Sequence, residues 1–204
     1  MRNFVSLLLI LTGLVFTAVS LFQFYQHSAS AKDSLQKAEQ LVADEEHPVD
    51  ARAQFAPKEN EEIGVLRIPK IEGVLPIVEG TADEMLKKGV GHFSSTVFPG
   101  DKEQILLSGH RDTVFRDFGQ LEKGDRFIID MPYGTFEYEM REAKIVEADD
   151  TTVIAPQGEE VLTLSTCYPF GYIGPAPDRY VIYAYPAKPS SGSQAQDRSG
   201  QNGE

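Results

Sequence analysis

Three side chains in the second half of the chain could together carry out acyl transfer: those of His110, Cys167 and Arg179. A cysteine thiolate is a strong nucleophile toward a carbonyl carbon, and a neighbouring cation favours the thiolate form. An imidazole can carry a proton to a departing amine. A guanidinium is too basic to accept a proton, so its role would be to hydrogen-bond a carbonyl or an oxyanion. These residue types suffice to cleave an amide bond through a covalent acyl intermediate.

Each of the three residues is expected at an end of a predicted strand. The run Val161–Thr166 alternates like a half-buried strand and leads into Cys167, and the apolar run Gln104–Ser108 leads through a glycine to His110. Arg179 opens the next strand after Cys167. If those two strands pair antiparallel, Arg179 returns to the side of the thiol. We therefore expect the three side chains to share one rim of the fold.

Eight short runs between residues 62 and 185 are rich in β-branched and aromatic residues and are separated by glycine and proline turn signals. This pattern predicts an all-β fold, an eight-stranded barrel in our interpretation, with a sandwich as the alternative. One or two short helices accompany the strands, the clearest with Thr81 as its N-cap. The predicted strands are Ile63–Ile68, Val74–Val78, Gln104–Ser108, Arg126–Met131, Thr135–Arg141, Ala143–Glu147, Val161–Thr166 and Tyr180–Tyr185.

The N-terminal run Phe4–Phe22 contains nineteen residues without a charge. As a helix it would be about 28 Å long, close to the hydrocarbon thickness of a bilayer. A cleaved signal peptide is the alternative, because Ala29-Ser30-Ala31 resembles a cleavage site, but the run exceeds the usual length of a signal-peptide core. We therefore predict a retained single-pass membrane anchor.

The remaining chain divides by composition. Residues 32–46 place apolar side chains on one helical stripe, and the Ser- and Gly-rich C-terminus has no large apolar residue. The predicted parts are 1–25, a short cytoplasmic end and transmembrane anchor; 26–61, a stalk helix and linker; 62–186, the barrel with the three candidate residues; and 187–204, a disordered tail.

Composition excludes several classes of function. Nineteen Lys and Arg against 31 Asp and Glu give a net charge of −12, which disfavours nucleic acid as a partner. One cysteine rules out an internal disulfide and a multi-cysteine metal cage. A zinc site from His92, His110 and Cys167 is disfavoured because no closely spaced ligand pair is present. We predict no metal and no cofactor; calcium at the acidic pairs 149–150 or 159–160 is the alternative.

Two motifs resemble a known family. The stretch Thr163-Leu164-Ser165-Thr166-Cys167, with Ser108-Gly109-His110-Arg111 upstream and Arg179 downstream, resembles the sortases of Gram-positive bacteria. The resemblance covers the core from residue 63 to 185, and it is greatest to the class D sortases of Bacillus-like organisms. It implies a cysteine transpeptidase, of the thiol-protease class of hydrolases, on an eight-stranded barrel. It also implies a location at the cell membrane, with the catalytic domain outside the cell and facing the wall.

The resemblance also implies a role for each candidate residue. Cys167 would attack the Thr carbonyl of an LPxT-type sorting signal near the C-terminus of a surface protein, His110 would protonate the departing amine, and Arg179 would stabilise the tetrahedral state. An amine of peptidoglycan, or of its lipid-linked precursor, would then resolve the thioacyl enzyme. Residues expected to contact the substrate are His92, which the sequence places in a turn after the short helix, together with Thr166, Tyr168, Phe170 and Ile173.

Two other functions stay open from the sequence. The first is a membrane-tethered, non-enzymatic cell-wall binding module in which Cys167 is a buried small hydrophobe. It predicts a thiol that does not react with alkylating reagents, whereas a sortase needs an accessible one. The second is another Cys/His cell-wall transpeptidase. The L,D-transpeptidases carry an arginine two residues after the cysteine, and Pro169 occupies that position here.

Overall fold

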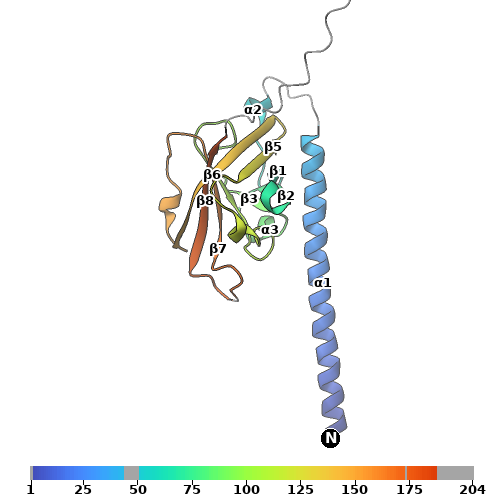
Figure 1. The fold of residues 1–204 in the computed structure, drawn as a ribbon. Coiled ribbons are helices and arrows are strands. Elements are labelled where there is room, and N and C mark those ends of the chain that lie inside the picture. Colours follow the sequence, from blue (N-terminus) through green and yellow to red (C-terminus); the bar gives the residue numbers. More distant parts are fainter. Residues whose placement is uncertain (1, 44–50, 173, 188–204) are drawn as a thin grey trace, which may run out of the picture.

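The computed structural model describes residues 2–43, 51–172 and 174–187, which form a long helix standing beside a closed β-barrel (Figure 1). The long helix is α1 (Arg2–Val42), and a single-turn helix, α2 (Ala51–Gln54), precedes the barrel. A third short helix, α3 (Asp83–Leu86), connects the second and third strands. The strands are β1 (Glu62–Ile68), β2 (Gly73–Glu79), β3 (Val90–His92), β4 (Gln104–Ser108), β5 (Arg126–Met131), β6 (Gly134–Glu147), β7 (Val161–Tyr168) and β8 (Asp178–Pro186).

The strands close in the order β1-β2-β3-β4-β7-β8-β6-β5, and β5 pairs back onto β1. Two neighbouring pairs, β2 with β3 and β4 with β7, are parallel; the other described pairs are antiparallel. Because β4 and β7 run side by side in one direction, the segments that follow them leave the barrel at the same end. Cys167 lies near this end of β7, and His110 lies in the segment that follows β4.

Alternate side chains of each strand fill the barrel. In β4 and β7 the inward residues are Ile105, Leu107, Leu162 and Leu164, each at most 1% exposed. Near the end of the barrel where β4 finishes, the rings of Phe115 and Phe118 stack 3.7 Å apart and pack against the same core, from which they exclude water. On the outward face of the two strands, Leu106, Val161 and Thr163 are covered by other parts of the chain, while Cys167 is partly exposed.

The predicted eight-stranded β-barrel is confirmed, although its strands differ from the predicted set in two places. The predicted runs 135–141 and 143–147 form one strand, β6, whose register to β8 shifts between Met140 and Glu142. The charged, exposed residues Arg141 and Glu142 at this irregularity interrupt the run of β-branched and aromatic residues in the sequence. The strand β3 was not predicted, because a three-residue strand that contains Gly91 and His92 has little strand propensity of its own.

The predicted N-cap of α3 was wrong. The helix begins at Asp83, and Ala82 is its N-cap, without a side-chain hydrogen bond. The chain just before it is held against β3, because the Gly80 amide donates to the His92 carbonyl at 2.9 Å. A Cβ added at Gly91 would lie 2.5 Å from the Gly80 carbonyl and 3.3 Å from the Thr81 Cα, which shows how closely these backbones approach. Thr81 therefore belongs to the strand connection rather than to the helix.

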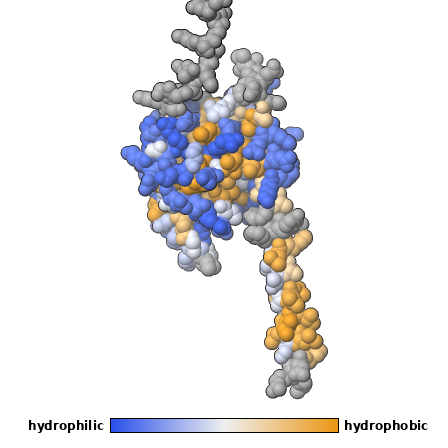
Figure 2. Space-filling view, turned by 45° about the vertical axis from the view of Figure 1, so that its right-hand side comes forward, coloured by the Kyte–Doolittle hydropathy of each residue, from blue (hydrophilic) through white to orange (hydrophobic). Residues whose placement is uncertain are grey.

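The expected anchor and stalk form one continuous helix. Its N-terminal part, Phe4–Phe22, is apolar, exposed, and long enough to cross a membrane, and it projects away from the hydrophilic barrel surface (Figure 2). Its C-terminal part lies against β1 and β2, where Ser34 and Ala38 are 1% and 0% exposed. The expected disordered tail and most of the linker after the stalk lie outside the described residues.

Candidate active site

The pairing of β7 with β8 places Arg179 directly opposite Cys167. Both residues point outward, because their neighbours Leu164 and Ile182, an odd number of positions away, point into the barrel core. Cys167 is a free, partly exposed cysteine, as a nucleophile requires. A thiol and a guanidinium therefore share the outer face of this strand pair at its end.

The chain after β4 lies beside the same strand end. The Gly109 amide donates to the Ser165 carbonyl at 3.1 Å, and the Thr166 hydroxyl donates to the Gly109 carbonyl at 2.7 Å, so the parallel ladder continues past Ser108. Glycine is required at position 109, since a Cβ there would lie 2.7 Å from the Phe115 ring. His110 follows at once, two residues after the end of β4, next to the strand that carries Cys167.

The imidazole of His110 remains accessible to solvent. Its side chain is 34% exposed, and its Nε2 lies 3.9 Å from a carboxylate oxygen of Asp83, in the first turn of α3. The His110 carbonyl accepts the Phe115 amide at 3.0 Å, which fixes the turn that carries the ring. The backbone here is thus constrained, while the ring itself can approach a substrate.

Sequence reasoning missed Arg111, which connects the two loops of the site. Its guanidinium donates to the carbonyls of Pro169 at 3.0 Å and of Tyr172 and Gly174 at 2.8 Å each. It also lies 5.7 Å from the centre of the Tyr172 ring. Arg111 therefore holds the β7–β8 loop against the segment that carries His110. The available signal was a cation next to the candidate histidine, within the SGHR motif.

Three of the expected substrate contacts lie close to Cys167 but take part in the fold. Thr166 is 3% exposed and its hydroxyl is used by Gly109. Tyr168 and Phe170 pack edge to face at 5.5 Å, and Phe170 contacts the Tyr180 ring at 5.2 Å against the barrel core. These aromatic rings close the end of the barrel. Contact between them and a substrate stays a prediction, and Ile173 lies outside the described residues.

The structure does not bring His92 to this site in an accessible form. His92 lies in β3 rather than in the expected turn, and its side chain is 1% exposed. Its Nδ1 lies 2.7 Å from Glu79 Oε2, its Nε2 lies 3.1 Å from the Val97 carbonyl, and its ring stacks on Phe98 at 4.5 Å. Both ring nitrogens thus have partners inside the protein, and no part of the ring faces a substrate.

One acid of each pair considered for calcium is engaged in local structure. The Asp150 carboxylate accepts the amide and hydroxyl of Thr152, which lowers the pKa of Asp150. Glu160 accepts the Tyr138 hydroxyl at 2.6 Å; burial, followed by this bond, raises the pKa of Tyr138. Among the described residues, no group of three or more His, Cys, Asp or Glu side chains is arranged to hold a metal.

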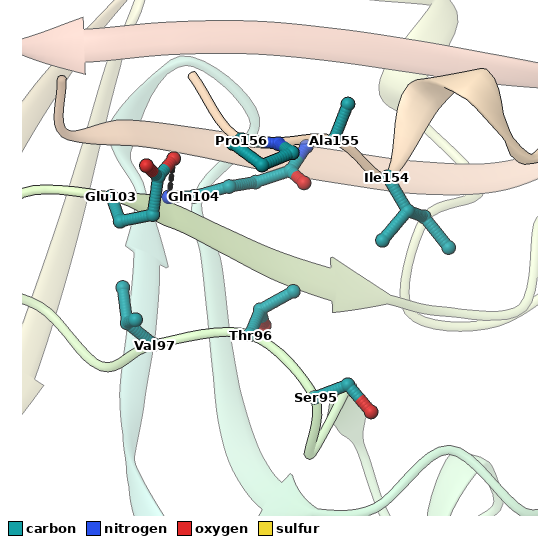
Figure 3. A pocket seen from close by; sticks show the side chains of 8 residues that line it. All are labelled: Ser95, Thr96, Val97, Glu103, Gln104, Ile154, Ala155 and Pro156. Carbon is teal, nitrogen blue, oxygen red and sulfur yellow. Dashed lines mark hydrogen bonds between the residues drawn. The ribbon is translucent and has the colours of Figure 1, made fainter. Parts of the chain in front are cut away.

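A cavity of about 180 Å³ lies near the other end of β4 and β7. Figure 3 shows it between the loop after β3, the start of β4, and the β6–β7 loop. The Gln104 side chain stabilises the wall of this cavity by donating to the Val153 carbonyl at 2.7 Å and to the Thr163 hydroxyl at 3.0 Å. The lining residues are Ser95, Thr96, Val97, Glu103, Gln104, Ile154, Ala155 and Pro156.

Glu103 fastens the β6–β7 loop at the edge of this cavity. Its carboxylate accepts the amides of Gln157 at 2.6 Å and Gly158 at 3.1 Å, together with the Gln104 amide at 3.0 Å. These bonds, that of Gln157 foremost, lower the pKa of Glu103. The loop is therefore held over the outward face of β4 and β7, the face that carries Cys167.

Comparison with known proteins agrees with this architecture. The family model of the sortase domain matches residues 66–187. Sortase D of Bacillus subtilis (strain 168) is 42% identical over 193 residues, 90% of this chain and 98% of the relative. Sortase SrtE1 of Streptomyces coelicolor is 31% identical over 124 residues, 52% of this chain and 35% of that protein.

Solved structures give the same result. A sortase D5 transpeptidase of Clostridium perfringens has a TM-score of 0.69 at 26% identity, over 78% of this chain and 99% of that one. The catalytic domain of SrtD from B. anthracis has a TM-score of 0.57 at 47% identity, over 66% of this chain and 93% of that one.

The chain forms a closed eight-stranded barrel with a cysteine and an arginine paired at the end of β7 and β8. The sortase family model matches most of this barrel, and the chain therefore belongs to the sortase family. Within that family it is a class D sortase, and the enzyme is a cysteine transpeptidase. Both the family and the enzyme class expected from the TLSTC and SGHR motifs are confirmed.

Proposed function

We propose that the enzyme cleaves an LPxT-type sorting signal through a thioacyl intermediate on Cys167 and transfers the surface protein to an amine of peptidoglycan or of its lipid-linked precursor. The observation that carries this proposal is the placement of Cys167 opposite Arg179 on an outward face, with His110 just after the end of the adjacent strand β4. Nucleophile, oxyanion donor and proton carrier then approach one carbonyl group from the protein side.

The chemistry proceeds in two balanced steps. The Cys167 thiolate attacks the Thr carbonyl carbon, and Arg179 donates hydrogen bonds to the oxyanion that forms. His110 gives a proton to the amide nitrogen of the following residue, the C–N bond breaks, and a thioester remains. An acceptor amine then attacks the thioester, His110 takes its proton, and the C–S bond breaks. Because one amide replaces another, no ATP is consumed.

The outward face of β4 and β7 is the proposed binding surface for the signal. Cys167 and Thr163 are outward residues of one strand, about 13 Å apart at the usual strand rise. An extended Leu-Pro-x-Thr segment spans about 10 Å between its Leu and Thr residues. With Thr at Cys167, the Leu-Pro part would extend along this face toward the cavity that Val97, Ile154 and Pro156 help to line. The apolar lining suits those two side chains.

We further propose that Phe4–Phe22 is a membrane anchor and that the barrel lies outside the cell. Support comes from the length, mean hydropathy of 2.4 and complete exposure of this segment. The alternative is a signal sequence cleaved at Ala29-Ser30-Ala31. The apolar run is longer than the usual core of a signal peptide, which favours a retained helix.

The test is cleavage of fluorogenic LPxTG- and LPxTA-type peptides by the full chain in detergent, with and without an amine acceptor. We expect acceptor-dependent transfer that Cys167→Ala abolishes and that Arg179→Ala lowers at least about 100-fold, the usual effect of removing an oxyanion donor. Arg116→Ala is the matched control, because Arg116 is exposed and bonds the Asp112 carbonyl four residues earlier. Its activity should be unchanged.

Appreciable transfer by Cys167→Ala would disprove the proposal. Alkylation of the wild-type thiol separates the alternatives if no peptide is cleaved. A reactive Cys167 would direct the search to other peptide signals, whereas an unreactive one would favour the binding module.

A further inference from the structure

The helix α1 is docked on the barrel rather than joined to it as a free tether. It contacts β1, β2 and β5, and Ser34 and Ala38, one helical turn apart, are fully buried. Val65 on β1 and Val78 on β2 are both 0% exposed although neither belongs to the core clusters of the barrel. Small residues on the helix and valines on the barrel therefore form a close, apolar contact.

The strand directions show which end of the barrel faces the apolar part of α1. From β1 to β7, the successive antiparallel, parallel, antiparallel and parallel pairings make β1, β4 and β7 run the same way. Their C-terminal ends, including Cys167, therefore lie at one end of the barrel. In Figure 1 this is the end past which the N-terminal half of α1 extends, while the β5–β6 turn lies at the opposite end.

The separation between that end and a membrane is short. Ser34, already in contact with the barrel, is twelve residues from Phe22, or about 18 Å along the helix. The headgroup layer of a bilayer occupies about 6 Å of this length. The barrel continues toward the membrane below this contact, since β1 runs on from Val65 to Ile68 and the loops extend farther, as Figure 1 shows for the β7–β8 loop.

The β7–β8 loop is the part of that end best suited to a lipid surface. The sequence from Tyr168 to Pro177 contains no charged residue, in a chain with a net charge of −12. Tyr172 is 51% exposed, and the Arg111 bonds to the loop carbonyls hold this segment in place. Tyrosine rings are favoured in the interface between headgroups and hydrocarbon, where one edge is apolar and the other is wet.

We propose that the barrel rests on the phospholipid surface by its β7–β8 loop, with Tyr172 in the headgroup layer, and that the docked helix α1 fixes this orientation. This inference rests on the membrane anchor of the proposed function. In this orientation the outward face that carries Cys167 and Arg179 opens next to the bilayer, and a thioacyl enzyme meets amines at the membrane surface before those farther away.

The chain has no tryptophan, so a single introduced one reports its own surroundings. The test places the full-length Tyr172→Trp variant in phosphatidylcholine vesicles that contain a lipid with a spin-labelled headgroup. The control is Thr135→Trp, an exposed position beside the β5–β6 turn at the opposite end. We expect the spin label to quench the tryptophan at 172 several-fold more strongly than the one at 135. Equal, weak quenching at both positions would overturn the proposal.

A second comparison tests the docked helix as the cause of the orientation. Ala38→Glu in the Tyr172→Trp background buries a charge between α1 and the barrel, and Gln40→Glu adds the same charge at an exposed position of the same helix. We expect quenching to fall with Ala38→Glu and to persist with Gln40→Glu. An insertion of six Gly and Ser residues after Ala29, which leaves the docked face intact, should have the same effect as Ala38→Glu.

Peptide cleavage in detergent is measured on every variant to separate the two proposals. Unchanged quenching after both Ala38→Glu and the insertion would overturn the role of α1, provided that the variants still cleave peptide. If no variant, nor the wild-type background, cleaves any peptide, the proposed substrate is wrong, while the difference in quenching still decides the orientation.

Discussion

Two histidines of this barrel, one in β3 and one just after the neighbouring strand β4, have opposite surroundings. His92 pairs with Leu107 across β3 and β4, and His110 comes three residues after Leu107 on the β4 side. The His92 ring is 1% exposed and bonded at both nitrogens, to the Glu79 carboxylate and the Val97 carbonyl. The His110 ring is 34% exposed, with a carboxylate of Asp83 at 3.9 Å, beyond hydrogen-bond length.

The difference bears on which of the two rings can act on a substrate. Turning a buried ring that is bonded at both nitrogens would break those bonds and cost stability, so such a ring serves the fold. A ring with a free nitrogen can exchange protons with a substrate at little cost. His92 therefore stabilises the barrel, while His110 is available for chemistry. Substitutions at the two positions should separate activity from stability.

The largest expected effect is on activity at His110. His110→Ala removes the proposed proton carrier and should lower kcat/KM for peptide transfer by about 10²–10⁴-fold, the usual contribution of a general acid or base. Its urea unfolding free energy should change by less than about 0.5 kcal/mol, as for other accessible positions. A loss of activity that parallels a loss of stability would remove the contrast between the two histidines.

His92→Ala should have the reverse effect. It leaves the Glu79 carboxylate, on a side chain 7% exposed, buried without its partner, and breaking a buried pair in this way costs about 3–5 kcal/mol. Urea unfolding followed by circular dichroism measures this loss. Peptide cleavage by the remaining folded enzyme should stay near that of the wild type. A change below about 1 kcal/mol would mean that the buried pair contributes little to the fold.

A smaller effect is expected from the carboxylate beside the active histidine. Asp83 is 70% exposed and also pairs with Lys87, so its interaction with His110 is weaker than the buried interaction of Glu79 with His92. Because exposed ion pairs contribute only about 0.2–1 kcal/mol, Asp83→Asn should lower kcat/KM by no more than about five-fold. The matched control is Glu84→Gln, at the next position of the same exposed helix. A hundred-fold loss with Asp83→Asn alone would make Asp83 an essential partner of His110.

The same contrast shows what sequence could predict. The juxtaposition of Cys167 and Arg179 could be predicted because β7 and β8 are neighbours in the chain and pair antiparallel, so local patterns determine which residues face each other. Glu79 and His92 are brought together by the parallel pairing of β2 with β3, in which they are direct partners. The three-residue strand β3 gives almost no local signal, and its partner cannot be read from spacing. His92 was therefore predicted in a turn.

Long-range contacts of side chains with the backbone were missed for a related reason. The bonds from Arg111 to the β7–β8 loop join residues about sixty positions apart. Carbonyl acceptors carry no sequence signature, since every residue has one. The docking of α1 on β1 and β2 depends on small residues, Ser34 and Ala38, which in the sequence were part of a general amphipathic stripe.

Glu103 is a second acidic residue with hydrogen-bond partners inside the protein. Its carboxylate accepts backbone amides, whereas that of Glu79 lies against the His92 ring. The Gln157 amide, and then that of Gly158, hold the pKa of Glu103 below its ordinary value of 4.5. A carboxyl whose pKa is lower in the folded chain stabilises the fold above its unfolded pKa, and this contribution is lost as the pH falls through the folded pKa. Glu103→Gln should therefore unfold at lower urea than the wild type at pH 7, and the difference should shrink below about pH 4.5.

Urea midpoints at pH 7 and pH 3 measure this effect, which should be the smallest of the four because the Glu103 carboxylate is open to solvent. Glu159→Gln is the control, since Glu159 is an exposed acid of the same loop. The proposed binding surface adds a second readout: a loosened β6–β7 loop should raise KM for the peptide more than it lowers kcat. A midpoint difference that stays constant or grows at low pH would show that the ionised carboxylate does not fasten the loop. In that case the cavity edge near Val97 and Pro156 must be held by the Gln104 side chain instead.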